Sequence, residues 1–99
     1  MKLFITGGSG FLGRNVVQYV LSQNNNITIN VLSRSSVSDD IILKAISKVE
    51  KGRERVNLIR GHINDESSLK EGLDGVNVVV HMAAKVYISL YHFKTIKIF

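Results

Sequence analysis

Residues 6–13 decide how this chain folds, and they read Thr6-Gly7-Gly8-Ser9-Gly10-Phe11-Leu12-Gly13. The apolar run that precedes them, residues 2–6, is typical of a buried parallel strand. A helical pattern follows from residue 11, because apolar side chains recur every three or four residues as far as residue 21. Gly7 and Gly10 therefore lie in a turn that joins a strand to a helix, and Gly13 lies in the first turn of that helix.

Glycine at these three positions has a physical purpose. Gly7 permits a tight turn out of the strand, Gly10 has no side chain to block a pyrophosphate, and Gly13 lets the helix pack close to the sheet. Free backbone N–H groups and the helix dipole then favour a phosphate anion. The stretch predicts dinucleotide binding by Gly7, Gly10, Phe11, Leu12 and Gly13, and a glycine-rich turn without a ligand is the alternative.

The rest of the chain alternates between strands and helices. Apolar runs predict further strands at 27–32, 56–60 and 76–82. Helical patterns lie between them, from an N-cap at Ser38 to about residue 51, and from an N-cap at Asp65 onward. This alternation predicts an α/β fold of the partial Rossmann type, a parallel sheet of about four strands in the order 3-2-1-4 with helices on both faces.

Three stretches together resemble a known family. The glycine-rich motif looks like the start of an extended short-chain dehydrogenase/reductase, the epimerase/dehydratase group. Residues 61–69 (GHINDESSL) resemble the segment after the third strand of that family, although His62 stands where the family usually has Asp. Residues 74–84 (DGVNVVVHMAA) resemble its fourth strand, which ends in His-x-Ala-Ala. The resemblance covers residues 1 to about 86.

The resemblance implies roles for four further residues. Asp65 would accept a hydrogen bond from the adenine amino group, with Ile63 packed beside the ring. Ala83 and Ala84 would bring the backbone close to the ribose and phosphates of the cofactor. A plain helix N-cap is the alternative role for Asp65, and the two roles are compatible because a carboxylate has two oxygens.

The residue at the end of the second strand bears on which dinucleotide binds. An NAD site uses an acidic residue there, about 20 residues after the glycines, to bind the ribose 2′-hydroxyl. Arg34 holds that position, with serines on both sides, and Asp39 and Asp40 lie too far into the next helix to replace it. A guanidinium with nearby hydroxyl donors suits a 2′-phosphate. The sequence therefore favours NADP, with NAD as the alternative.

The catalytic pair of the family is not found in this sequence. The family uses Tyr-x-x-x-Lys, in which the Lys lowers the pKa of the Tyr so that it can act as a general acid or base. Tyr19, Tyr87 and Tyr91 are followed four positions later by Gln, Tyr and Thr. We therefore expect no catalytic residue here, and a chain that serves as the cofactor-binding segment of an epimerase, dehydratase or reductase. A non-catalytic NAD(P)-binding sensor or regulatory module is the alternative.

The end of the chain departs from the family pattern. We expect residues 1–86 to form the NAD(P)-binding Rossmann half, and residues 87–99 to be an atypical tail, either cut short or unrelated in sequence. Without a fifth strand, residues 76–82 would present an apolar edge and favour self-association. The β-prone stretch 87–93 (YISLYHF) offers another arrangement, in which the tail covers that edge.

Composition excludes several other classes of protein. A chain of 99 residues allows one domain, and the absence of Cys excludes disulfide scaffolds, zinc ribbons and thiol catalysis. The three His residues lack metal-ligand spacing, so no metal site is expected. The net charge is +5, but the basic residues of 44–60, Arg55 among them, alternate with Glu and have no interleaved aromatic residue. Nucleic-acid binding is therefore not expected, and we expect these residues to form a solvated face. No run approaches the ~20 apolar residues of a membrane helix, and we expect a cytoplasmic protein.

Overall fold

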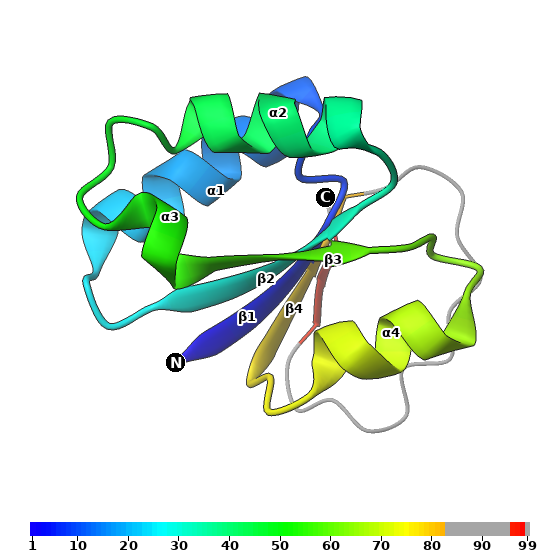
Figure 1. Cartoon of the computed structure of the whole chain (residues 1–99). Helices are drawn as coiled ribbons and strands as arrows, with labels where there is room; N and C mark the ends of the chain where they lie inside the picture. The colour runs from blue at the N-terminus through cyan, green and yellow to red at the C-terminus, as the bar shows by residue number, and fades with distance from the viewer. Residues whose placement is uncertain (83–95, 99) are drawn as a thin grey trace.

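A parallel sheet forms the centre of the molecule. The computed structural model describes residues 1–82 and 96–98. Its strands are β1 (Lys2–Thr6), β2 (Thr28–Ser33), β3 (Val56–Arg60), β4 (Val78–His81) and β5 (Ile96–Ile98). They lie in the order β3-β2-β1-β4-β5, and every neighbouring pair is parallel (Figure 1). The predicted order 3-2-1-4 and the α/β class are confirmed.

The helices cover both faces of the sheet. Helices α1 (Phe11–Gln23) and α2 (Ser36–Ala45) lie over one face, and α4 (Glu66–Leu73) lies over the other (Figure 1). The short α3 (Gly52–Arg55) leads directly into β3. From β1 to β3, each new strand is added on the same side of the one before it. The connection from β3 to β4 then crosses back over the sheet and places β4 on the other side of β1. Right-handed crossovers in opposite directions place their helices on opposite faces.

Alternation along β1 divides the core into two layers. Leu3 and Ile5 point to the face under α1 and α2, where they pack in a cluster with Val17 of α1 and Ile42 of α2. Phe4 points to the opposite face and packs in a second cluster, which the side chains of α4 complete. Successive strand side chains point to opposite faces, so a strand covered on both sides is apolar throughout.

A buried amide attaches α4 to the sheet. The Asn30 side chain of β2 donates to the carbonyl oxygen of Gly72 at 2.8 Å and accepts from Asn57 Nδ2 at 3.0 Å. A Cβ at Gly72 would lie 2.4 Å from the Phe4 ring, so only glycine lets α4 approach this closely. These contacts hold α4 against the sheet, and β4 is the next element along the chain.

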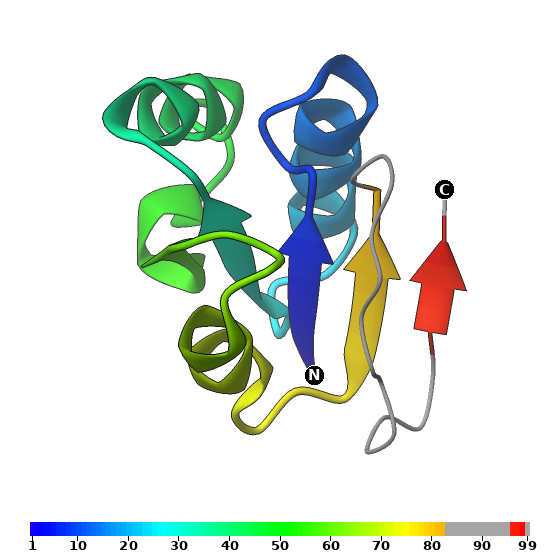
Figure 2. The same cartoon turned by 90° about the vertical axis from the view of Figure 1, so that its right-hand side faces the viewer.

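The strand β5 covers β4. Ile96 pairs with Val79 and Ile98 with His81 in parallel register (Figure 2). The prediction that β4 forms an exposed edge is therefore wrong, and a covering strand, the other arrangement that the sequence allowed, is the one observed. It comes from residues 96–98, whereas the stretch 87–93, which the sequence offered as the covering strand, lies outside the described residues.

The boundaries of α2 differ from those predicted. Ser35 is the N-cap, because its Oγ accepts from the Ser38 backbone N–H at 3.2 Å. The prediction of Ser38 as the N-cap is wrong, since Ser38 already lies in the first turn. The helix ends at Ala45 rather than near residue 51, and Lys51, with φ 54°, precedes the separate helix α3.

One of the basic residues that we expected to be solvated is part of the structure. Arg55 is buried, and its Nε donates to the carbonyl oxygen of Ile27 at 3.1 Å. Its terminal nitrogens donate to the carbonyl oxygens of Glu50 and Asn24. The guanidinium thus satisfies two carbonyl groups of the α1–β2 turn and the Glu50 carbonyl of the segment before α3.

Candidate cofactor site

The glycine-rich turn brings α1 against the end of β1. Gly7 has φ 75°, a left-handed conformation that glycine adopts at no steric cost, and its carbonyl oxygen accepts from Gly10 N–H at 3.2 Å. A Cβ on Gly13 would lie 1.8 Å from that same oxygen. The turn therefore closes only with glycine at 13, as the sequence predicts for close packing of a helix on a strand.

The N-terminus of α1 is open. Gly10 is the N-cap and provides no side-chain hydrogen bond, and no acidic residue lies in the first turn. Phe11 and Leu12 are strongly exposed, and the guanidinium carbon of Arg14 lies 5.4 Å from the centre of the Phe11 ring. The first backbone N–H groups of a helix have no partner within the helix and attract an anion. This end of α1 has the geometry of a phosphate site.

The carboxyl ends of the strands lie at the same edge as this turn. Thr6, Ser33, Arg60 and His81 end β1, β2, β3 and β4, respectively. The strand order reverses between β1 and β4, because β2 lies on one side of β1 and β4 on the other. In open α/β sheets, ligands bind outside the carboxyl ends at this point of reversal. The glycine turn and the reversal thus coincide.

A buried polar pair joins β1 to β4 at this edge. The Thr6 hydroxyl lies 2.5 Å from His81 Nδ1 and accepts from the Met82 backbone N–H at 3.3 Å. Which of Thr6 Oγ1 and His81 Nδ1 donates depends on the tautomer of His81. Burial lowers the pKa of His81. Sequence analysis placed His81 at the strand end, but gave no indication of its partner Thr6.

Burial of His81 makes stability depend on pH. The unfolded chain has the ordinary His pKa of about 6.5, whereas the folded chain has a lower pKa. The unfolded chain therefore binds the proton first as the pH falls. We expect the free energy of unfolding to be steady above about pH 7.5 and to decrease as the pH falls through about 6.5, by at most about 1.4 kcal/mol per pH unit.

Urea unfolding between pH 8 and pH 5.5 measures this dependence. The variant His81→Asn keeps an acceptor near Thr6 but does not titrate in this range, so its slope should be smaller. The exposed His62 is the matched control, and His62→Asn should keep the wild-type slope. An unchanged slope in His81→Asn would contradict the assignment.

Arg34 lies where the sequence placed it, directly after β2. It is exposed, and in the described part of the chain no carboxylate forms an ion pair with it. The hydroxyl groups beside it are engaged: Ser33 donates to Asp39 and Ser35 caps α2. The guanidinium is therefore the group that this turn presents at the carboxyl edge.

Asp65 caps α4 as the sequence indicated. Its Oδ1 accepts from Ser67 N–H at 3.2 Å and from Ser67 Oγ at 2.9 Å, and its Oδ2 accepts from Ser68 Oγ. The hydroxyls of Ser68 and Ser67 lower the pKa of Asp65. Each carboxylate oxygen has two acceptor positions, so Oδ2 keeps one for a donor outside the helix. Ile63 is half-buried and packs against the cluster under α4. Ala83 and Ala84 lie outside the described residues.

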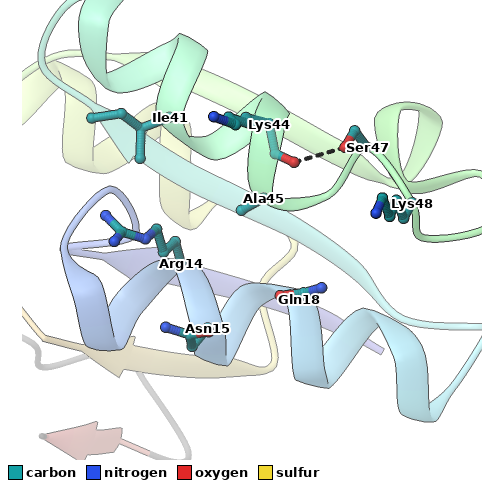
Figure 3. A pocket seen from close by; sticks show the side chains of 8 residues that line it. All are labelled: Arg14, Asn15, Gln18, Ile41, Lys44, Ala45, Ser47 and Lys48. Carbon is teal, nitrogen blue, oxygen red and sulfur yellow. Dashed lines mark hydrogen bonds between the residues drawn. The ribbon is translucent and has the colours of Figure 1, made fainter.

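A basic groove lies between α1 and α2 (Figure 3). It has a volume of about 560 Å³, and its cations are Arg14, Lys44 and Lys48. All eight acidic side chains of the chain belong to the described residues, and the two ion pairs found there, Arg60–Asp39 and Lys70–Glu66, leave these cations out. The groove therefore contributes a positive potential that attracts anions toward this face of the sheet.

Two other kinds of site were searched for in the described residues. Across 1–82 and 96–98, no three His, Asp or Glu side chains come together as a metal site would require. In the same residues, no helix has the length and apolar character needed to cross a membrane.

Comparison with known proteins agrees with this geometry. Residues 4–98 match the 3-beta hydroxysteroid dehydrogenase/isomerase family. The chain belongs to this family. The resemblance to extended short-chain dehydrogenases/reductases is thereby confirmed, and the expected Rossmann fold with it.

Among curated relatives, the 3 beta-hydroxysteroid dehydrogenase/Delta 5-->4-isomerase of Vaccinia virus (strain Copenhagen) is 38% identical over 82 residues, 83% of this chain and 21% of the relative. The sterol-4-alpha-carboxylate 3-dehydrogenase, decarboxylating, of Dictyostelium discoideum is 33% identical over 85 residues, 86% of this chain and 23% of the relative. The chain thus spans between a fifth and a quarter of the length of these two relatives.

Solved structures of related proteins contain both forms of the cofactor. The dTDP-glucose 4,6-dehydratase from Bacillus anthracis, in complex with NAD, has a TM-score of 0.68 and 25% identity over 86% of this chain and 27% of its own. AtPrR2 with NADP+ and (+)pinoresinol has a TM-score of 0.61 and 27% identity over 86% of this chain and 26% of its own. The fold of this family member is therefore one that accommodates nicotinamide dinucleotides.

Proposed function

We propose that this chain binds NAD(P) and is the cofactor-binding segment of an NAD(P)-dependent epimerase, dehydratase or reductase. The observation that carries the proposal is the glycine turn. Gly7, Gly10 and Gly13 leave the N-terminus of α1 uncapped at the reversal point of the sheet. Family membership supports the same function.

Each part of the dinucleotide has a proposed partner. Backbone N–H groups from Phe11 to Gly13 bind the pyrophosphate, beside the exposed side chains of Phe11 and Leu12. Asp65 binds the adenine amino group, with Ile63 beside the ring. Ala83 and Ala84 approach the ribose and phosphates, as the resemblance implies. The nicotinamide supplies hydride transfer when it is bound.

A non-catalytic sensor or regulatory module is the second candidate. It is favoured by β5, because a strand that covers β4 is what an independent binding module needs. Sedimentation of the 99-residue chain with and without NADPH separates the two. A stable monomer that binds NADPH tightly favours the module, whereas an aggregating chain that binds NADPH only weakly favours the enzyme segment. Self-association, cytoplasmic location and the division at residue 86 stay predictions.

We propose NADP as the preferred cofactor, with NAD as the alternative. Arg34 is exposed at the end of β2 and has no carboxylate partner among the described residues, so it is available to a 2′-phosphate. Charge-assisted hydrogen bonds contribute about 1.5–3 kcal/mol. We therefore expect Arg34→Ala to weaken NADPH binding roughly tenfold to a hundredfold and to leave NADH binding within about twofold.

Calorimetric titration of both cofactors tests this preference. The matched control is Arg53→Ala, which removes the same charge from the exposed surface of α3, before β3 begins. It should leave both affinities near those of the wild type. Equal losses for NADPH and NADH in Arg34→Ala would contradict the assignment to the 2′-phosphate, and no binding of either cofactor by the wild type would contradict the function itself.

A further inference from the structure

A carboxylate that the glycine motif does not include lies beside the turn that carries Arg34. Asp39 is in the first turn of α2, and its side chain is 22% exposed. One of its oxygens accepts from the Ser33 hydroxyl, and the other forms an ion pair with Arg60. Its own backbone N–H donates to the carbonyl oxygen of Ser35 at 3.0 Å. Asp39 thus bonds to the residues on both sides of Arg34.

Three elements meet at this carboxylate. Ser33 ends β2, Arg60 ends β3, and Asp39 belongs to α2. Ser33 is almost fully buried, and its backbone carbonyl oxygen accepts a hydrogen bond from the Gly61 N–H at 3.0 Å. The backbone on the strand side of Arg34 is therefore fixed from two directions, and the turn has little freedom to move Arg34 away from the carboxyl edge.

The ion pair has a second consequence. Arg60 ends the neighbouring strand, so its guanidinium would compete with Arg34 for an anion at this edge. Its bond to Asp39 engages that charge. Arg34 is then left as the unpaired arginine at the ends of β2 and β3 in the described structure.

We infer that Asp39 is a positioning residue that sets the preference for a phosphate on the adenosine ribose, by holding the turn 33–35 so that Arg34 faces the bound cofactor. The inference rests on the proposed cofactor function. Asp39 does not touch the ligand and acts through Arg34. Its removal should therefore change the ratio of the NADH and NADPH dissociation constants, which a general loss of stability would not do.

The test is a pair of double variants with equal net charge. Asp39→Ala/Arg60→Gln deletes the acceptor for Ser33 without freeing the Arg60 cation. Asp39→Asn/Arg60→Gln has the same charge and the same change at Arg60, but keeps an acceptor oxygen for Ser33. We expect Asp39→Ala/Arg60→Gln to lower the ratio of the NADH dissociation constant to the NADPH dissociation constant at least fivefold below the wild-type value. Asp39→Asn/Arg60→Gln should keep most of the wild-type ratio. NADH affinity should stay within about twofold in both.

Two further variants make the result specific. Ser33→Ala removes the same hydrogen bond from the strand side, so it should lower the ratio in the same direction even where the double variant folds poorly. In an Arg34→Ala background, Asp39→Ala/Arg60→Gln should cause no further change.

Each contrary outcome has a distinct meaning. An unchanged ratio in both Asp39→Ala/Arg60→Gln and Ser33→Ala would overturn the role of Asp39. The role would also be overturned if Asp39→Ala/Arg60→Gln changed the ratio equally in the wild-type and Arg34→Ala backgrounds. A wild type that binds both cofactors with equal affinity would overturn it while the proposed function stands. A wild type that binds neither would overturn both.

Discussion

Gly13→Ala is expected to destabilise the fold severely. The new Cβ would lie 1.8 Å from the carbonyl oxygen of Gly7, 2.7 Å from its carbonyl carbon and 2.8 Å from Gly8 Cα. All three atoms are backbone, so no side-chain rotation relieves the contact. The helix α1 must move away from β1, and this opens the core around Val17 and Leu21. Overpacking costs about 1–3 kcal/mol where neighbours can adjust, and here we expect about 3 kcal/mol or more.

Thermal and urea unfolding followed by circular dichroism measure this loss. A chain of this size has a total stability of about 5–15 kcal/mol, so a loss of 3 kcal/mol is a large fraction of it. The matched control is Gly10→Ala in the same motif, where the nearest atom would lie at 3.5 Å, an ordinary contact. A melting temperature of Gly13→Ala within about 4 °C of the wild type would show that α1 does not need glycine here.

Local patterns were sufficient to predict most of the sheet. Each strand up to β4 is a short apolar run next to a turn. A strand that is buried on both faces is apolar along its whole length, so it can be recognised without knowing which strands lie beside it. The boundary of α2 was harder, because Ser33, Ser35, Ser36 and Ser38 are all suitable N-caps by residue type. The part-buried hydrogen bond from Ser33 to Asp39 and the cap at Ser35 determine which serine is used. The first of these joins two side chains that no local sequence pattern relates.

The parts of the site that sequence analysis missed are contacts between distant residues. Thr6 and His81 are 75 positions apart, and nothing near either residue indicates the other. Arg55 was expected in solvent because it lies among charged residues, yet it reaches carbonyl groups 28 and 31 positions away. The glycine motif was recognisable because its chemistry lies within eight consecutive residues. Buried polar pairs carry no such local signal, since tertiary packing decides them.

Gly10→Asp is expected to separate binding from stability. Gly10 has φ −71° and ψ 169°, which any residue adopts, and a Cβ there has room. Asp is a preferred N-cap, and its charge suits the positive end of α1, so the helix should be at least as stable as in the wild type. The same carboxylate would lie where we place the pyrophosphate.

The expected loss of binding in Gly10→Asp follows from like charges. At about 4 Å and an effective dielectric constant of 20, two unit charges repel by about 4 kcal/mol. We therefore expect NADPH and NADH affinities to fall together by at least about a hundredfold, with an unchanged or higher melting temperature. Gly10→Ala adds bulk without charge and should show a smaller loss. If Gly10→Asp binds either cofactor as the wild type does, the phosphate does not lie at the N-terminus of α1, because a carboxylate and a pyrophosphate cannot share that position.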